Sequence, residues 1–157
     1  MNKHGFTLIE LLVVVLIIGI LSAIAFPQYE VSVGKSRTID AITNLRAITE
    51  AQEAYFLATG AYTNDIGVLD VDVKPVTKFY TYSCLWNRTC SASPRSTNLP
   101  NLEFHMQMNP TGTSAAHLGK HWCMARPDNE IQKAICANWG PLDPAMTTTS
   151  WYYHIVQ

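Results

Sequence analysis

The chain has 157 residues, which is enough for one domain or for one domain with an appendage. Its formal net charge is −1, so no basic excess indicates a nucleic-acid partner and no acidic run indicates a solvating tail. Hydrophobic residues make up 48% and charged residues 15%, whereas soluble domains carry roughly 25% charged residues. This composition excludes a disordered chain, and it excludes a simple soluble protein unless the apolar surplus is confined to one segment.

The apolar surplus is confined to residues 6–26. Only Thr7, Glu10, Gly19 and Ser22 depart from apolar side chains there, and Glu10 carries the only charge. A helix over this segment would be about 32 Å long, close to the roughly 30 Å hydrocarbon core of a bilayer. The rest of the chain has an ordinary globular composition. The sequence therefore predicts a membrane-active N-terminal helix attached to a soluble domain.

Three interpretations of this segment are open. In the first it is a secretory signal peptide, with Lys3 and His4 before the apolar run and an A-x-A sequence at residues 23–25. In the second it is a plain single-pass anchor. In the third a short leader is removed before Phe6, and the apolar helix stays on the mature protein.

Glu10 separates these interpretations. A carboxylate costs about 2.5–3.5 kcal/mol at mid-bilayer, and neither a signal peptide nor a passive anchor gains anything from that cost. No Lys or Arg lies nearby within the helix, but cleavage before Phe6 would free a cationic α-amine about one helical turn from Glu10. That amine would pair with Glu10 of its own chain or of a neighbour. Helical periodicity also resumes after Pro27, which is unlike the independent domain that follows a signal peptide.

One string and three later residues carry a family resemblance: GFTLIELLVV at residues 5–14, then Gly19, Pro27 and Tyr29. Together they resemble the N-terminal signature of type IV pilins, a family that also includes the pseudopilins of type II secretion systems. The resemblance extends along the long helical part of the chain and is most specific over residues 5–29. It favours the third interpretation.

The resemblance implies how the N-terminus is processed and used. It implies that residues 1–5 are a prepilin leader, that a membrane prepilin peptidase cleaves between Gly5 and Phe6, and that the new terminal Phe6 is N-methylated. It implies that Glu10 pairs with the Phe6 amine of an adjacent subunit during assembly on an inner-membrane platform. The five-residue leader and Phe6 at the first mature position resemble the type IVa class. Lys3 keeps the leader cytoplasmic by the positive-inside tendency, so the remainder lies outside.

The first half of the long helix covers residues 6–27 and is expected to span the bacterial inner membrane before assembly and to form the filament core afterwards. Gly19 and Pro27 are its weak points, because Gly costs about 1 kcal/mol relative to Ala and Pro removes a backbone donor. The resemblance to pilins suggests that residues 19–27 lose helicity in filaments.

The second half, residues 28–60, is expected to be an amphipathic helix that continues into the globular domain. Apolar residues recur there at a spacing of three to four, which predicts a stripe that packs on the core. The stripe consists of Ile39, Ile42, Leu45, Ile48 and Tyr55. Gly60 is the expected end of this helix.

Residues 61–157 are expected to hold the αβ loop, an antiparallel sheet and a disulfide-bonded C-terminal region. Alternating patterns predict strands, and clusters of Ser, Thr, Asn and Pro predict loops. The expected strands are residues 78–84, 102–108, 121–125 and 151–156; the loops are 60–77, 91–100 and 109–114; and a short helix covers 128–139 before Gly140 and Pro141. The fold class is therefore α+β, a long helix packed on a small antiparallel sheet, as in the pilin fold that the resemblance implies.

Four cysteines lie in the part expected outside the membrane, where an even number and an oxidising location favour disulfides. Three connectivities are open. We favour Cys84–Cys90 and Cys123–Cys136 because each pair closes a local loop. The resemblance supports the second pair more than the first, since pilins often staple a C-terminal loop.

No pattern indicates a metal or a cofactor strongly. The oxygen-rich residues 63–72 lack EF-hand spacing, although some pseudopilins bind calcium. His117, His121 and Cys123 form an incomplete zinc set, and no base, orienting group and oxyanion site accompany a nucleophile. Asn87 begins an N-x-T sequon.

The sequence therefore favours a structural pilus subunit that polymerises into a cell-surface filament for adhesion, twitching motility or DNA uptake, and not an enzyme. A pseudopilin or a minor pilin is the alternative within the family, and an anchored or secreted binding domain is the alternative outside it. No nucleic-acid site is evident, because the basic residues are too scattered to propose a patch. These residues are Lys74, Lys78, Arg88 and Arg95.

Overall fold

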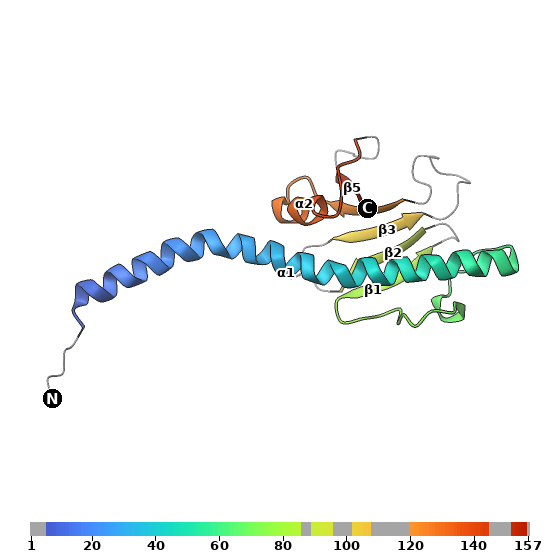
Figure 1. Ribbon diagram of the computed structural model, residues 1–157, viewed down its shortest axis with the longest axis horizontal. Coiled ribbons are helices and arrows are strands. Elements are labelled where there is room, and N and C mark those ends of the chain that lie inside the picture. Colours follow the sequence, from blue (N-terminus) through green and yellow to red (C-terminus); the bar gives the residue numbers. More distant parts are fainter. Residues whose placement is uncertain (1–5, 86–88, 96–101, 108–119, 145–151, 157) are drawn as a thin grey trace, which may run out of the picture.

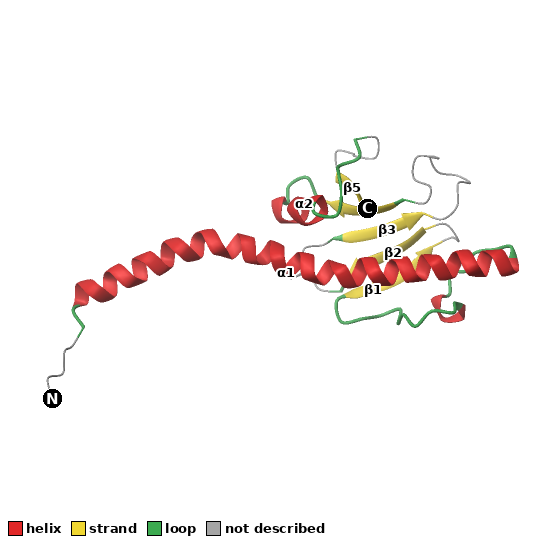
Figure 2. Ribbon diagram, in the orientation of Figure 1, coloured by secondary structure: helices red, strands yellow, loops and turns green. Residues whose placement is uncertain are grey.

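The computed structural model describes residues 6–85, 89–95, 102–107, 120–144 and 152–156. Within them a long helix lies on one face of a five-stranded antiparallel sheet, and a short second helix packs at one end (Figure 1). Figure 2 shows two parts of the molecule. We call the first half of the long helix, which no strand covers, the stalk. We call the sheet, with the second half of the helix lying over it, the head. This arrangement confirms the α+β class predicted from the sequence.

The long helix α1 covers Leu8–Thr59 without a break. It ends as expected at Gly60, which has a left-handed conformation with φ 78° that glycine adopts without steric cost. The Gly60 N–H donates to the carbonyl of Phe56 at 2.8 Å. The predicted αβ loop follows and contains one turn of 3-10 helix over Ile66–Val68.

The half of α1 that lies on the sheet buries one face, as its periodicity predicted for Ile42, Leu45 and Ile48. Ile39 was wrongly placed on this face and is 54% exposed, because Thr38, about 100° away around the helix, points inward instead. Thr38 is buried without an unpaired hydroxyl: it donates to the carbonyl of Lys35 at 2.8 Å and accepts from the Trp139 indole at 3.0 Å.

The strands follow one another in space as they do in sequence, so the sheet is an antiparallel meander. Four strands were predicted, with ends that differ by up to two residues. The bounds are β1 Tyr80–Leu85, β2 Thr89–Pro94, β3 Glu103–Gln107, β4 His121–Ala125 and β5 Tyr152–Val156.

Strand β2 was missed, and part of it had been predicted as the loop 91–100. It carries small side chains that lack the bulky or β-branched signature of a strand. Cys90, Ser91 and Ala92 are nevertheless buried, and α1 packs against this strand. Small residues here let the helix approach the sheet closely, so the tertiary packing outweighs the weak local preference.

The core lies between α1 and the near face of the sheet. Tyr82, Ala92, Phe104 and Cys123 are neighbours in one row of the register and are all buried. The Tyr82 hydroxyl accepts from the Asn44 amide at 3.0 Å and donates to a helix carbonyl, so the polar end of this core residue is satisfied.

Both outer edges of the sheet are covered by the chain itself. Beside β1, the Tyr82 N–H donates to the carbonyl of Pro75 at 2.8 Å. Beside β5, the Asp143 N–H donates to the carbonyl of Tyr153 at 2.8 Å, and the Ile155 N–H donates to that of Pro141 at 3.0 Å. Backbone groups that an edge strand would present to solvent are therefore partly paired.

The second helix, α2, covers Glu130–Ala137 inside the range predicted for it. Asn129 caps its start by accepting from the Gln132 N–H at 3.0 Å. Helix α2 packs against α1, β4 and β5 and so closes one end of the sheet.

Candidate assembly site on the N-terminal helix

The first half of α1 leaves the body of the protein and makes no contact that buries it. Every residue from Phe6 to Tyr29 is exposed, and the Phe6 side chain is 90% exposed. By length and composition this helix is apolar enough to cross a membrane. Monomeric proteins rarely expose a continuous apolar surface of this extent, so the segment requires a membrane or other protein chains around it.

Glu10 closes the N-terminus of α1 in a capping box with Thr7. The Thr7 N–H and hydroxyl both donate to one oxygen of the Glu10 carboxylate at 2.7 Å, and the Glu10 N–H donates back to the Thr7 hydroxyl at 3.3 Å. Thr7 has extended backbone geometry, as an N-cap requires. The sequence predicted a cation as the partner of Glu10, and Thr7 was not among the predicted partners. The Thr-x-x-Glu spacing was the signal that would have found it.

The capping box leaves the Glu10 carboxylate at the surface of the helix, where Thr7 supplies neutral donors within the described part of the chain. Phe6 precedes the box directly, and its nitrogen would become a cationic amine on cleavage before it. Gly5, the other residue of the predicted cleavage site, lies outside the described residues. The pairing of Glu10 with a Phe6 amine stays a prediction.

The two predicted weak points are both helical in this subunit. A Cβ atom at Gly19 would meet nothing within 4 Å, and Pro27 lies inside the helix, where it removes one backbone donor. The stalk departs at an angle from the part of α1 on the sheet (Figure 1). Loss of helicity between these two residues in a filament stays a prediction.

Two known protein families match this chain. Residues 1–26 match the prokaryotic N-terminal methylation motif, and residues 39–150 match the family of type IV pilin-like G and H proteins. The second match covers well over half of the chain.

The chain belongs to the type IV pilin-like family. It is 47% identical to the type IV major pilin protein PilA of Myxococcus xanthus over 69 residues, which cover 42% of this chain and 31% of that protein. It is 47% identical to a fimbrial protein of Pseudomonas aeruginosa over 55 residues, 35% of this chain and 36% of the relative. The identity to the type IV major pilin protein PilE of Neisseria gonorrhoeae is 38% over 63 residues, 40% of this chain and 38% of the relative. The matched part thus spans about a third of the length of these relatives.

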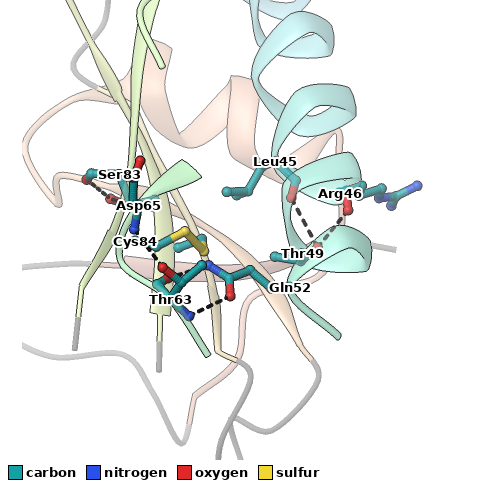
Figure 3. Close-up of a disulfide and its surroundings, with 10 residues drawn as sticks. Leu45, Arg46, Thr49, Gln52, Thr63, Asp65, Ser83 and Cys84 are labelled. Carbon is teal, nitrogen blue, oxygen red and sulfur yellow. Dashed lines mark hydrogen bonds between the residues drawn. A yellow bond between two sulfur atoms is a disulfide. The ribbon is translucent and has the colours of Figure 1, made fainter. Parts of the chain in front are cut away.

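Both predicted disulfides of this pilin are present. Cys84–Cys90 joins β1 to β2 at directly paired positions, with Cα atoms 4.0 Å apart. Cys123–Cys136 joins β4 to α2, with Cα atoms 5.5 Å apart. Figure 3 shows the first bridge near Thr49 and Gln52 of α1, so it ties the hairpin together where the helix covers it.

The weaker candidates of the sequence lie only in part within the described residues. The described residues contain no group of three or more His, Cys, Asp or Glu side chains that could hold a metal ion. Asp65, in the oxygen-rich loop, caps the 3-10 turn by accepting from the Gly67 N–H at 2.8 Å. Cys123 is in a disulfide, while His117 and Asn87 lie outside the described residues.

The basic residues of the pilin head are less scattered than the sequence indicated. Lys74, Lys78 and Arg95 line one hollow beside the β1 edge of the sheet. Arg88 lies outside the described residues. The prediction that the basic residues are scattered is wrong for these three, because the strand register returns Arg95 to the start of β1: the Arg95 backbone N–H donates to the carbonyl of Phe79 at 2.9 Å.

Proposed function

We propose that this pilin is the structural subunit of a type IV pilus and polymerises through residues 6–26. The observation that carries the proposal is the apolar half-helix that is exposed along its whole length in a chain of the pilin family. Keeping this surface out of water is favourable by roughly 25 cal/mol per Å² of apolar area, so the half-helix stays in an apolar environment, first the membrane and then the filament core.

Before assembly the same half-helix anchors the subunit in the inner membrane, with the head outside. A prepilin peptidase cleaves between Gly5 and Phe6 and the terminal Phe6 is methylated. The match to the N-terminal methylation motif supports this processing. The assembled pilus lies at the cell surface, and the subunit's role there is structural and not enzymatic.

Glu10 sets the register between subunits in this proposal. Its carboxylate exchanges the neutral Thr7 donors for the Phe6 amine of a neighbour, because a buried carboxylate without a cationic partner is penalised in an apolar filament core. A subunit inserted one helical turn out of register would leave both charges unpaired.

The experiment replaces Glu10 by Ala in the full chain in piliated cells. We expect a processed, membrane-bound subunit at normal level and few or no filaments in sheared surface material examined by electron microscopy. Glu30→Ala removes a carboxylate from the same helix outside the apolar half and is the matched control. Normal filaments from Glu10→Ala would contradict the role given to Glu10.

Two measurements separate the alternatives. Mass spectrometry of the mature protein should show an N-methylated Phe6; a terminus at Met1 or Phe26 would instead indicate an anchored or secreted binding domain. Long surface fibres built of this chain would exclude a short periplasmic pseudopilus. The relatives named as major pilins favour a major subunit over a minor one.

A further inference from the structure

Charges of opposite sign are separated along the sequence of the pilin head. Residues 47–73 contain Glu50, Glu53, Asp65, Asp70 and Asp72 and no Lys or Arg. Residues 74–95 contain Lys74, Lys78, Arg88 and Arg95 and no Asp or Glu. In the fold, Lys74, Lys78 and Arg95 lie on one flank of α1, whereas Glu50 and Glu53 lie on another.

The first flank carries a basic hollow, which we define by Lys74, Lys78, Arg95 and Val76 beside Asn44 of α1. Its volume is about 540 Å³, and Asp72 is its one acidic lining residue. The hollow is partly fixed in shape, because the Arg95 guanidinium donates to the carbonyl of Thr77 at 2.9 Å. Within the described residues, none of the three cations forms an ion pair.

The second flank carries an acidic tip, which we define by Glu50, Glu53 and Leu57 on the last three turns of α1. Leu57 is 84% exposed, and both carboxylates are exposed. The Tyr62 hydroxyl donates to Glu53 at 3.0 Å, and the Tyr62 ring stacks on Phe56 with ring centroids 4.6 Å apart.

A buried amide fixes the loop behind the acidic tip. The Gln52 side chain, which is fully buried, accepts from the Thr63 N–H at 3.1 Å and donates to the Thr63 carbonyl (Figure 3). The tip is thus presented in a defined shape, so it needs little ordering when it binds.

The hollow and the tip point in different directions. Asn44, which lines the hollow, and Glu53, in the tip, are nine residues apart, or about 2.5 helical turns, so they lie on opposite sides of α1. Each surface also has one exposed apolar side chain among its charges: Val76 is 50% exposed in the hollow, and Leu57 is its counterpart in the tip. Two different complementary surfaces on opposite sides form a heterologous contact that repeats into an open helical array.

The axial spacing of the two surfaces agrees with a shared apolar core. Asn44 and Leu57 are 13 residues apart, about 20 Å along the helix. A neighbour offset by that distance still has its apolar half-helix, about 32 Å long, beside that of the first subunit over part of its length. The contact between heads and the contact between stalks are therefore compatible.

We propose that the basic hollow of one subunit receives the acidic tip of a second copy of this chain. This inference rests on the proposed function, since it concerns how neighbouring subunits meet in the filament. Lys74, Lys78 and Arg95 face Glu50 and Glu53 across the contact, with Leu57 against Val76. The contact selects the correct neighbour, because a subunit placed with like surfaces together opposes charges of the same sign.

The test reverses the charges in full-length protein in piliated cells. Lys74→Glu with Lys78→Glu, or Glu50→Lys with Glu53→Lys, should each lower the yield of sheared filaments about tenfold, and the chain with all four changes should recover most of it. Asp128→Lys, an exposed reversal near α2, is the control and should leave the yield unchanged. Equal membrane levels of all variants show that the heads fold.

Covalent trapping gives a second readout. With Leu57→Cys and Val76→Cys in one chain, oxidised filaments should give a ladder of multimers on a non-reducing gel, while each single variant should not. Wild-type yield from both double reversals, or no recovery in the quadruple variant, overturns the contact. If wild-type filaments also fail to form or lack this chain, the proposed function itself fails.

Discussion

α1 is one continuous helix, but only its second half is buried against the rest of the chain. Residues 28–59 bury a face against the protein's own sheet, with Leu45 and Ile48 almost inaccessible to solvent. Residues 8–27 are exposed on every side. The difference shows that a segment can form a helix without being buried by its own chain. The sheet buries the apolar face of the second half, whereas burial of the first half requires a bilayer or other protein chains.

The largest expected effect is on the free energy of unfolding, when a leucine is replaced in the buried half and in the exposed half of α1. Leu45→Ala should lower the free energy of unfolding by about 2–5 kcal/mol, because it leaves a cavity under α1. Leu16→Ala, which removes the same atoms from an exposed position, should change it by about 0.5 kcal/mol or less. Urea unfolding of the full chain in detergent, followed by tryptophan fluorescence, compares them. Equal losses would mean that the stalk contributes to the stability of the head.

The C-terminal disulfide should be next in magnitude. Replacing both Cys123 and Cys136 by Ser frees α2 from β4 and should cost about 2–4 kcal/mol of stability of the head. The helicity of the stalk should not change, since residues 6–29 are exposed and are not buried against the part of the head that this bridge holds. Denaturant unfolding checks the first point and far-ultraviolet circular dichroism the second; a loss of stalk helicity would show that the halves are coupled.

A smaller effect is expected from Gly19→Ala. The added methyl group meets nothing within 4 Å and should favour the helix by about 1 kcal/mol. The unassembled subunit should therefore keep its membrane level, while the filament yield should fall if residues 19–27 unwind on assembly. Quantification of both fractions by immunoblot is the measurement, with Ala23→Gly as the opposite change. An unchanged yield would indicate that the stalk assembles without unwinding.

The smallest expected effect concerns the pKa of Tyr62, whose ring stacks on Phe56 near the end of α1. Burial, with the neighbouring Glu53 carboxylate, raises the pKa of Tyr62 to about 12. An unfolded chain loses this proton near pH 10, so Tyr62 contributes stability below that pH that is lost as the pH rises to about 12. Ultraviolet titration of wild type against Tyr62→Phe isolates the group. Glu53→Gln should move its pKa back toward the usual range; no movement would mean that burial alone is responsible.

Sequence reasoning predicted the features that periodicity or a single residue type determines. The stripe at Leu45 and Ile48 follows from helical spacing, and the end of α1 follows from Gly60, where the chain needs a left-handed residue. Strand β2 could not be predicted because its buried residues are small, and their role depends on the approach of α1. Thr7 was readable from its spacing to Glu10 but was overlooked.

The basic hollow was beyond sequence reasoning for a different reason. Lys74 and Lys78 lie in and after the αβ loop, and Arg95 follows β2. Only the antiparallel register, which pairs Tyr80 with Pro94, brings these segments together. A charge cluster formed by two segments that are separate in the sequence has no periodicity along the chain.

The covered edges of the sheet have a consequence for the proposed filament, in which heads would lie at high local concentration. Heads crowded along a fibre would aggregate if strands could be added from one chain to the next. The segments at Pro75 and Pro141 occupy backbone groups on which such addition would begin. In the proposed filament, growth would therefore proceed through side-chain surfaces and the apolar stalk, which can be reversed, and not through a continuous β-structure, which would make the fibre hard to dismantle.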